Sequence, residues 1–173
     1  INRYQMQSLQ FYMAYGFNNA FPDYCDVPSA YDLARVIGDD NALSFAFINV
    51  SKFSNWGEDW KLEYGLVMKS LSQSQGTPYL SQQIELLNPD VICSMNVLGM
   101  AGNQIGKYNY VRKLSCHDVS VHDYFLPQGR VIPLLDMWHF SATRKSPRTH
   151  YYAPVAEHYK QWRERYPSIN IGS

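Results

Sequence analysis

Three short apolar runs between helix-like segments constrain the fold of this chain more than any other feature. The runs are Leu43–Val50 (LSFAFINV), Asp90–Met95 (DVICSM) and Arg130–Met137 (RVIPLLDM). Their length and their β-branched and aromatic residues predict strands, and the unbroken apolar character of the first run predicts burial on both faces. Pro133 favours an edge position or a strand start for the third run.

Helical periodicity occupies much of the chain around these runs. Helices are predicted over Tyr4–Tyr15, Ala30–Ile37 with Ser29 as N-cap, Trp60–Leu71, Thr77–Leu87, Val97–Ile105 and Pro154–Tyr166. Gly16 is expected to end the first helix, and Val111–Val121 is expected to be polar and irregular, with one edge strand at most. Alternating helices and strands predict an α/β fold, a three-layer α/β/α sandwich with a short, mainly parallel sheet. Ligands of such sheets bind at the carboxyl ends of the strands.

Composition narrows the class of protein. The 173 residues predict a single domain over 1–173, and 46% apolar residues supply a real core. No apolar run approaches the roughly 18 residues of a membrane span, and 15 basic residues balance 15 acidic ones, which gives no sign of a polyanionic partner. Cys25, Cys93 and Cys116 are expected to be free thiols in a reducing cytoplasm. The chain starts at Ile1 without a signal peptide, and further residues are expected to precede it.

Two polar positions stand at the ends of predicted strands. Asn49 is an amide in an apolar run, and an amide can read the polar edge of a planar base. The competing interpretation is a core asparagine bonded to nearby backbone. His139 follows the third run, and a neutral histidine there can donate to an oxygen that becomes anionic during a reaction. The competing interpretation is a loop histidine that caps backbone groups.

Three segments, in this order, resemble motifs of the uracil-DNA glycosylase superfamily: Phe47–Lys52 (FINVSK), Leu87–Ile92 (LNPDVI) and His139–Ser141 (HFS). That family has a strand ending in an asparagine that reads the flipped base, an LxPxVIxxxG helix-to-strand unit, and a late strand leading to a His-Pro-Ser loop. The resemblance spans about residues 29 to 165. It implies a cytoplasmic, cofactor-free enzyme that flips a uracil or modified base from DNA and hydrolyses its N-glycosidic bond, in repair or phage defence.

The resemblance also implies roles for individual residues. Asn49 would read the base, His139 would stabilise negative charge on the departing base, and Ser141 would contact a backbone phosphate. Arg144 would fill the vacated stack. Phe21 would stack on the extruded base, with ordinary packing as the competing interpretation.

A local basic bias follows the His139 loop. Arg144, Lys145 and Arg148 would hold DNA phosphates, or else form a solvated face. If the resemblance holds, these residues rim one cavity between Asn49 and His139, whose polar tips should lie roughly 6 to 12 Å apart around a planar base. Ile92 and Cys93 would lie beneath that cavity.

The sequence departs from the family at two points. Phe140 stands where the family has proline. The family's first motif, a strand and glycine-rich loop that position the attacking water, is not found and is expected upstream of Ile1. The predicted domain would then lack its N-terminal strand.

Other functions remain open at this stage. One is a non-catalytic base- or nucleotide-binding module of the same fold, and another is an unrelated doubly wound enzyme acting on a free nucleotide. A further cluster carries metal-ligand side chains: Cys116, His117, Asp118, His122 and Asp123. On a strand, His117 and Asp123 would not share a face with the other three, so a polar surface loop without metal is predicted.

Overall fold

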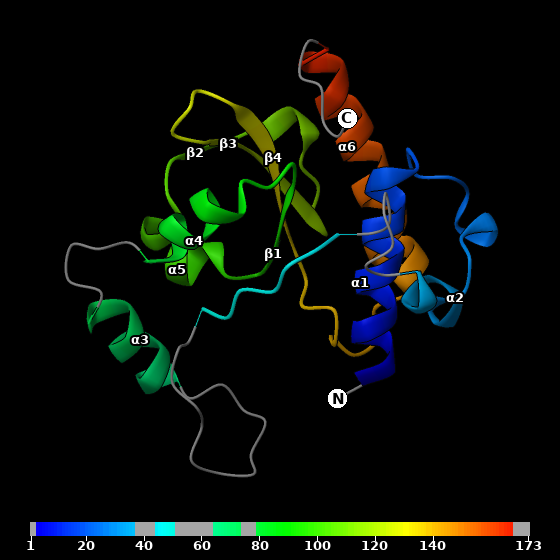
Figure 1. Ribbon diagram of the computed structural model, residues 1–173, viewed down its shortest axis with the longest axis horizontal. Coiled ribbons are helices and arrows are strands. Elements are labelled where there is room, and N and C mark those ends of the chain that lie inside the picture. The colour runs from blue at the N-terminus through cyan, green and yellow to red at the C-terminus, as the bar shows by residue number, and fades with distance from the viewer. Residues whose placement is uncertain (1–2, 37–43, 51–63, 74–78, 168–173) are drawn as a thin grey trace.

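The computed structural model describes residues 3–36, 44–50, 64–73 and 79–167. Its helices are α1 (Arg3–Asn18), α2 (Ala30–Arg35), α3 (Tyr64–Gln73), α4 (Tyr79–Leu87), α5 (Leu98–Ile105) and α6 (Ala153–Arg165). Its strands are β1 (Ile92–Met95), β2 (Tyr108–Tyr110), β3 (Val119–Phe125) and β4 (Val131–Met137). Short 3-10 turns η1 (Tyr24–Asp26) and η2 (Arg112–Leu114) and a π-helical turn η3 (Pro147–Tyr152) complete the described elements (Figure 1). None of the described helices has the length and apolar character needed to cross a membrane.

The sheet is mixed, with strand order β1-β4-β3-β2. β1 runs parallel to β4, whereas β3 is antiparallel to both β4 and β2. The prediction of a mainly parallel sheet is therefore wrong. The reason is the connection between β3 and β4, where the N–H of Leu126 donates to the Arg130 carbonyl at 2.9 Å and Gly129 turns the chain at φ +80°. So short a turn makes a hairpin, because a parallel pair needs a long crossover.

β4 lies in the middle of the sheet, between β1 and β3. Pro133 is fully buried there, so the expected edge position is wrong. The pairing of β4 with β1 begins only at Leu134, one residue later. Pro133 thus precedes the parallel ladder.

Side chains alternate along the strands and build a core on each face of the sheet. On one face, buried residues of the strands pack with α1 and α6: Val119, Val121, Leu135 and Met137 with Leu9, Met13, Val155 and Trp162. On the other face, they pack with α3, α4 and α5: Tyr124, Ile132 and Leu134 with Val67, Leu80, Ile84 and Ile105. Figure 1 shows α1 and α6 on one side and α4 and α5 on the other. Helices thus cover both faces.

The helix predictions hold with small shifts. Ser29 is the N-cap of α2, since its Oγ accepts a hydrogen bond from the N–H of Asp32 at 3.2 Å. Gly16 does not end α1, which continues to Asn18. A Cβ at Gly16 would lie 2.5 Å from a ring carbon of Phe21, so the glycine serves close packing instead.

Two strand predictions fail. Residues 44–50 form no strand, and the side chains of Phe45 and Phe47 are exposed; Ile48 and Val50 alone of this segment's hydrophobic residues pack against the α3–α5 core. The expected position of Asn49 near a strand end is therefore wrong. Conversely, β3 occupies part of the stretch expected to be irregular. β3 is a central strand and not an edge strand, and its buried Asp123 accepts a hydrogen bond from Trp162 of α6.

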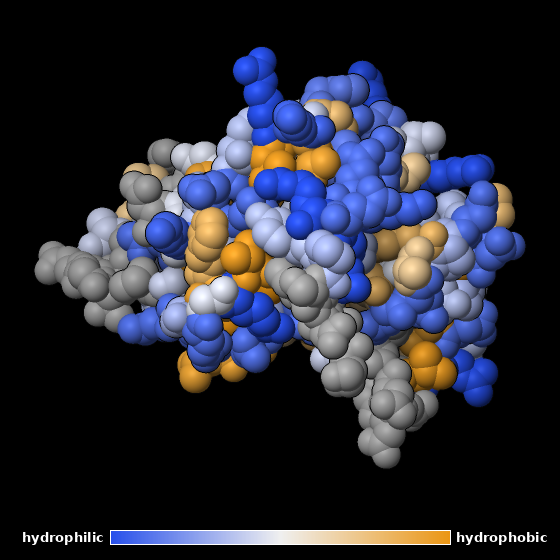
Figure 2. Space-filling model, turned by 90° about the horizontal axis from the view of Figure 1, so that it is seen from above, coloured by the Kyte–Doolittle hydropathy of each residue, from blue (hydrophilic) through white to orange (hydrophobic). Residues whose placement is uncertain are grey.

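Figure 2 shows a mostly hydrophilic face with apolar residues in separate patches. This distribution suits the balanced charge of the sequence, with 15 basic and 15 acidic residues.

Candidate functional site

Polar side chains gather where the parallel strands β1 and β4 end, at Met95 and Met137. This edge is where open α/β sheets bind ligands. Two residues after β4 comes His139, which is exposed. Phe140 anchors the loop, since it is 2% exposed and its ring packs edge-on against Tyr151 at 5.5 Å. Phe140, which stands where the glycosylase motif has proline, thus anchors the His139 loop in the core.

The loop fixes the tautomer of His139. The N–H of Ser141 donates to His139 Nδ1 at 3.2 Å, and the Ser141 hydroxyl lies 2.7 Å from the same nitrogen. Because Nδ1 accepts, the neutral ring carries its proton on Nε2. The His139 side chain is exposed, and no hydrogen bond to Nε2 is found among the described residues. His139 therefore caps the backbone N–H of Ser141, as the competing interpretation expects. The Nε2–H group of its ring takes no part in this contact.

Backbone contacts hold the same loop in place. The Tyr151 hydroxyl donates to the His139 carbonyl at 2.9 Å, and the N–H of Ala142 donates to it at 2.8 Å. From α1, Gln5 Nε2 donates to the carbonyls of Phe140 at 3.1 Å and Lys145 at 3.2 Å. Three separate parts of the chain therefore position His139.

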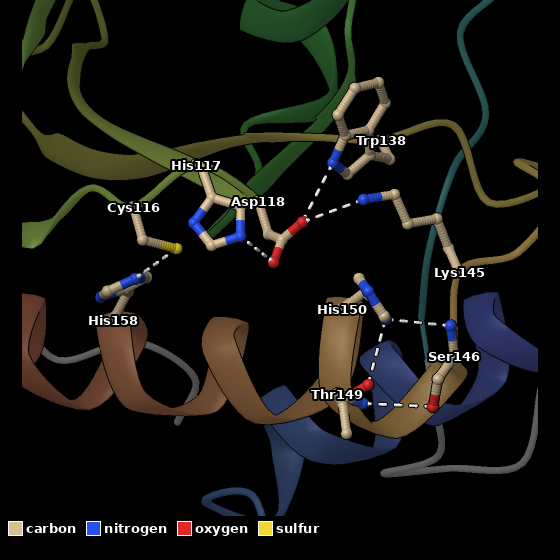
Figure 3. A network of polar contacts seen from close by, with 9 residues as sticks. All are labelled: Cys116, His117, Asp118, Trp138, Lys145, Ser146, Thr149, His150 and His158. Carbon is tan, nitrogen blue, oxygen red and sulfur yellow. Dashed lines mark hydrogen bonds and ion pairs between the residues drawn. The ribbon is translucent and has the colours of Figure 1, made fainter.

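Beside this loop, Asp118 is at the centre of a network of polar contacts (Figure 3). Its Oδ1 accepts from Trp138 Nε1 and from Lys145 Nζ, each at 3.2 Å, and its Oδ2 lies 3.1 Å from His117 Nε2. The Lys145 ammonium also lies 4.5 Å from the centre of the Trp138 ring. Burial would raise the pKa of Asp118, but the hydrogen bonds from Lys145 and Trp138 hold it below its usual value. Lys145, expected to bind phosphate, is thus already paired.

The loop before β3, which carries Asp118, also contacts α6. Cys116 Sγ lies 3.4 Å from His158 Nε2, as Figure 3 shows. Burial lowers the pKa of His158, with Glu157 acting in the opposite direction. The three cysteines are free thiols, as predicted, and burial raises the pKa of Cys93 to about 12. Among the described residues, no three His, Cys, Asp or Glu side chains are arranged to hold a metal.

The remaining predicted residues are spread around the loop. Arg144 is exposed at φ +63°, a left-handed conformation, and Arg148 makes an exposed ion pair with Asp23 at 3.7 Å. Phe21 lies in an aromatic cluster, with ring centres 4.9 Å from Phe17 and 5.2 Å from Tyr152. These contacts suit the packing interpretation of Phe21.

Asn49 is exposed in the irregular segment 44–50. A shallow hollow on α4 is lined by Gln82, Glu85 and Leu86. The structure thus brings His139 together with Ser141, and Lys145 together with Asp118. The predicted cavity between His139 and Asn49 remains a prediction.

No protein-family model, curated protein or solved structure matches this chain. The evidence for the candidate site is therefore its geometry. Sequence reasoning missed Ser94 and Asp136, polar residues on the same sheet edge, one position before the last residue of β1 and of β4. Their signal was a serine and a carboxylate within otherwise apolar runs, DVICSM and RVIPLLDM.

Proposed function

We propose that this protein is a DNA glycosylase-like enzyme, similar to the uracil-DNA glycosylases, which flips a base from DNA and hydrolyses its N-glycosidic bond. The observation that carries the proposal is the tautomer of the exposed His139 ring. Its Nδ1 accepts from the Ser141 backbone, so the exposed ring presents a neutral Nε2–H donor at the carboxyl end of β4. A base inside a duplex cannot reach such a group and must be extruded first.

The donor matches the charge that develops in this reaction. When the bond between C1′ and the base nitrogen breaks, its electron pair stays on the base and spreads to a carbonyl oxygen. A positioned N–H at that oxygen stabilises the charge, an effect typically of about 3 kcal/mol. The oxygen of a water molecule bonds to C1′ and gives up one proton, and the departing base finally takes up one proton from solvent.

The other assignments follow from the surroundings of the loop. Ser141 is a positioning residue, because its N–H donates to His139 Nδ1 and its hydroxyl contacts the same nitrogen. Arg144 and Arg148 are exposed and provide phosphate contacts. Asn49 is exposed as well, and its role in reading the base stays a prediction.

The test is base release from oligonucleotides that carry uracil or modified cytosines. We expect wild type to release one of these bases and His139→Ala to lose about 100-fold or more in rate. The matched control is His117→Ala, because His117 is another exposed histidine near the same loop. Equal inertness of wild type and His139→Ala on every substrate would contradict the enzyme. DNA binding without base release would instead favour the non-catalytic module.

A further inference from the structure

A row of polar side chains crosses the sheet one residue before the ends of β1 and β4. Asp136 of β4 lies opposite Ser94 of β1 and opposite Ser120 of β3. Directly opposed residues of neighbouring strands point to the same face. Because Ile132 and Leu134 alternate with Asp136 on β4, this is the face covered by α3, α4 and α5. His122 extends the row, with its Nε2 3.1 Å from the Ser120 hydroxyl.

Asp136 is held by the chain that enters α5. Burial raises the pKa of its carboxyl, whereas the Ser94 hydroxyl and the backbone N–H groups of Val97 and Asn96 favour the charged form. Even so, Asp136 Oδ1 has no hydrogen-bond partner within good geometry, and neither does Ser94 Oγ. Ser94 is only 5% exposed. Proteins leave few buried polar atoms unpaired, because a buried group without a hydrogen bond loses its bonds to water and gains none in return.

Exposed residues, among them His139, follow this row closely in the chain. Asn96 and Trp138, each two residues beyond Ser94 or Asp136, are exposed at the edge of the sheet. His139 follows Asp136 by three residues, so their Cα atoms are at most roughly 10 Å apart along an extended chain. A pyrimidine with a hydrogen bond at each end of its polar edge spans roughly the same distance.

We propose that Asp136 and Ser94 read the base and that the base is a cytosine-type pyrimidine, with an amino group beside a ring nitrogen. This inference rests on the proposed function for taking the ligand to be a nucleobase. A carboxylate oxygen accepts and a hydroxyl donates, so Asp136 receives the amino N–H and Ser94 donates to the ring nitrogen. The Nε2–H of His139 donates to the carbonyl oxygen next to the glycosidic bond.

The same three groups reject uracil, thymine and adenine. Uracil and thymine present a carbonyl oxygen where cytosine has its amino group, so an acceptor would face Asp136. Adenine has the amino group and the ring nitrogen but no carbonyl oxygen for His139. Carboxylates accept from the cytosine amino group in protein–DNA complexes for the same reason.

The first experiment measures binding without catalysis. Free cytosine and free uracil are titrated into labelled protein, and the amide NMR signals of Asn96 and Val97 are followed. We expect cytosine to bind about tenfold more tightly than uracil. Asp136→Asn exchanges the acceptor for an amide that can also donate, so this variant should reverse the preference. Ser94→Ala should weaken cytosine binding, and the matched control Asp118→Asn, on the same sheet edge, should keep the wild-type preference.

The outcomes separate this inference from the proposed function. Equal or tighter binding of uracil by wild type, no binding of either base, or an unchanged preference in Asp136→Asn would overturn the inference. His139-dependent release of uracil, with cytosine ignored, would overturn it while the glycosylase proposal stands. Cytosine binding with the Asp136→Asn reversal, but no base release from any oligonucleotide, would leave the inference standing and remove the glycosylase.

Discussion

Each face of the sheet carries an aspartate, buried Asp123 on one and half-buried Asp136 on the other, and the two carboxylates differ in their partners. Asp123 of β3 faces α6, where its Oδ1 accepts from Trp162 Nε1 at 2.8 Å and its Oδ2 accepts from the Tyr166 hydroxyl at 2.9 Å. The Arg165 guanidinium adds an ion pair at 3.8 Å. Asp136 of β4 faces the other core and keeps one oxygen without a partner.

The difference teaches that burial of a charged group does not by itself mark a functional site. Every oxygen of Asp123 is used within the protein, so this carboxylate joins β3 to α6 and has nothing left for a ligand. Asp136 is oriented by the backbone but not satisfied. Incomplete pairing is therefore the more useful sign of a binding role.

Asp123→Ala should produce the largest effect on this comparison. It leaves the indole N–H of Trp162, which is 0% exposed, without an acceptor. We expect the free energy of unfolding to fall by about 3 kcal/mol or more, measured by urea denaturation. Asp136→Ala should cost much less. Similar losses for both variants would remove the distinction between the two carboxylates.

Asp136→Asn should change how stability depends on pH. Burial raises the pKa of Asp136 above its usual value. The folded protein then binds more protons than the unfolded chain between the two pKa values, so wild-type stability falls as pH rises through that window. The variant should lose this fall and be at least as stable as wild type at pH 7, in melting curves recorded across the acid range. A steeper fall in the variant would argue against an unsatisfied carboxylate.

Asp118→Asn provides the opposite case on the same edge. Although burial acts to raise it, the pKa of Asp118 is lowered by the hydrogen bonds from Lys145 and Trp138. Its stabilising contribution is then complete above the usual aspartate pKa and is lost as pH falls toward the lowered one. We expect the variant to be less stable than wild type at pH 7, with the difference closing in acid. The same melting curves measure this, and a constant difference at all pH values would contradict it.

Ser94→Ala should have the smallest effect on stability. Its buried hydroxyl has no partner of good geometry, so removing it should leave the free energy of unfolding unchanged or raise it by about 1 kcal/mol. Urea denaturation measures this. A clear loss of stability would show that the hydroxyl is satisfied in solution, and the case for a ligand at this position would weaken.

Local signals in the sequence predicted the helices better than the sheet. Ser29 caps α2 and the spacing of Val155, Tyr159 and Trp162 marks α6, because both signals act between residues close in the chain. β3 was missed because the partners of Asp123 lie 39 and 43 residues away. Residues 44–50 have strand-like residues but no pairing strand among the described residues.

Some residues of the candidate site could likewise be predicted from local sequence, and others could not. His139 was identified because it directly follows an apolar run and because of its place in a family-like motif. Its tautomer depends on Ser141, two residues on, and this contact was not foreseen. Asp136 could not be singled out, since its importance depends on strand register and on the chain that enters α5.

The topology of the sheet also sets an order of assembly. Asp136 and Ser120 belong to one hairpin, whereas Ser94 arrives on β1 from about forty residues earlier in the chain. Short-range pairings form at lower entropic cost than long-range ones, so we expect the hairpin to fold first and β1 to dock afterwards. Amide protons of β1 should accordingly exchange with solvent faster than those between β3 and β4, as hydrogen exchange can measure. A transient release of β1 alone would separate Ser94 from Asp136 while leaving the hairpin paired.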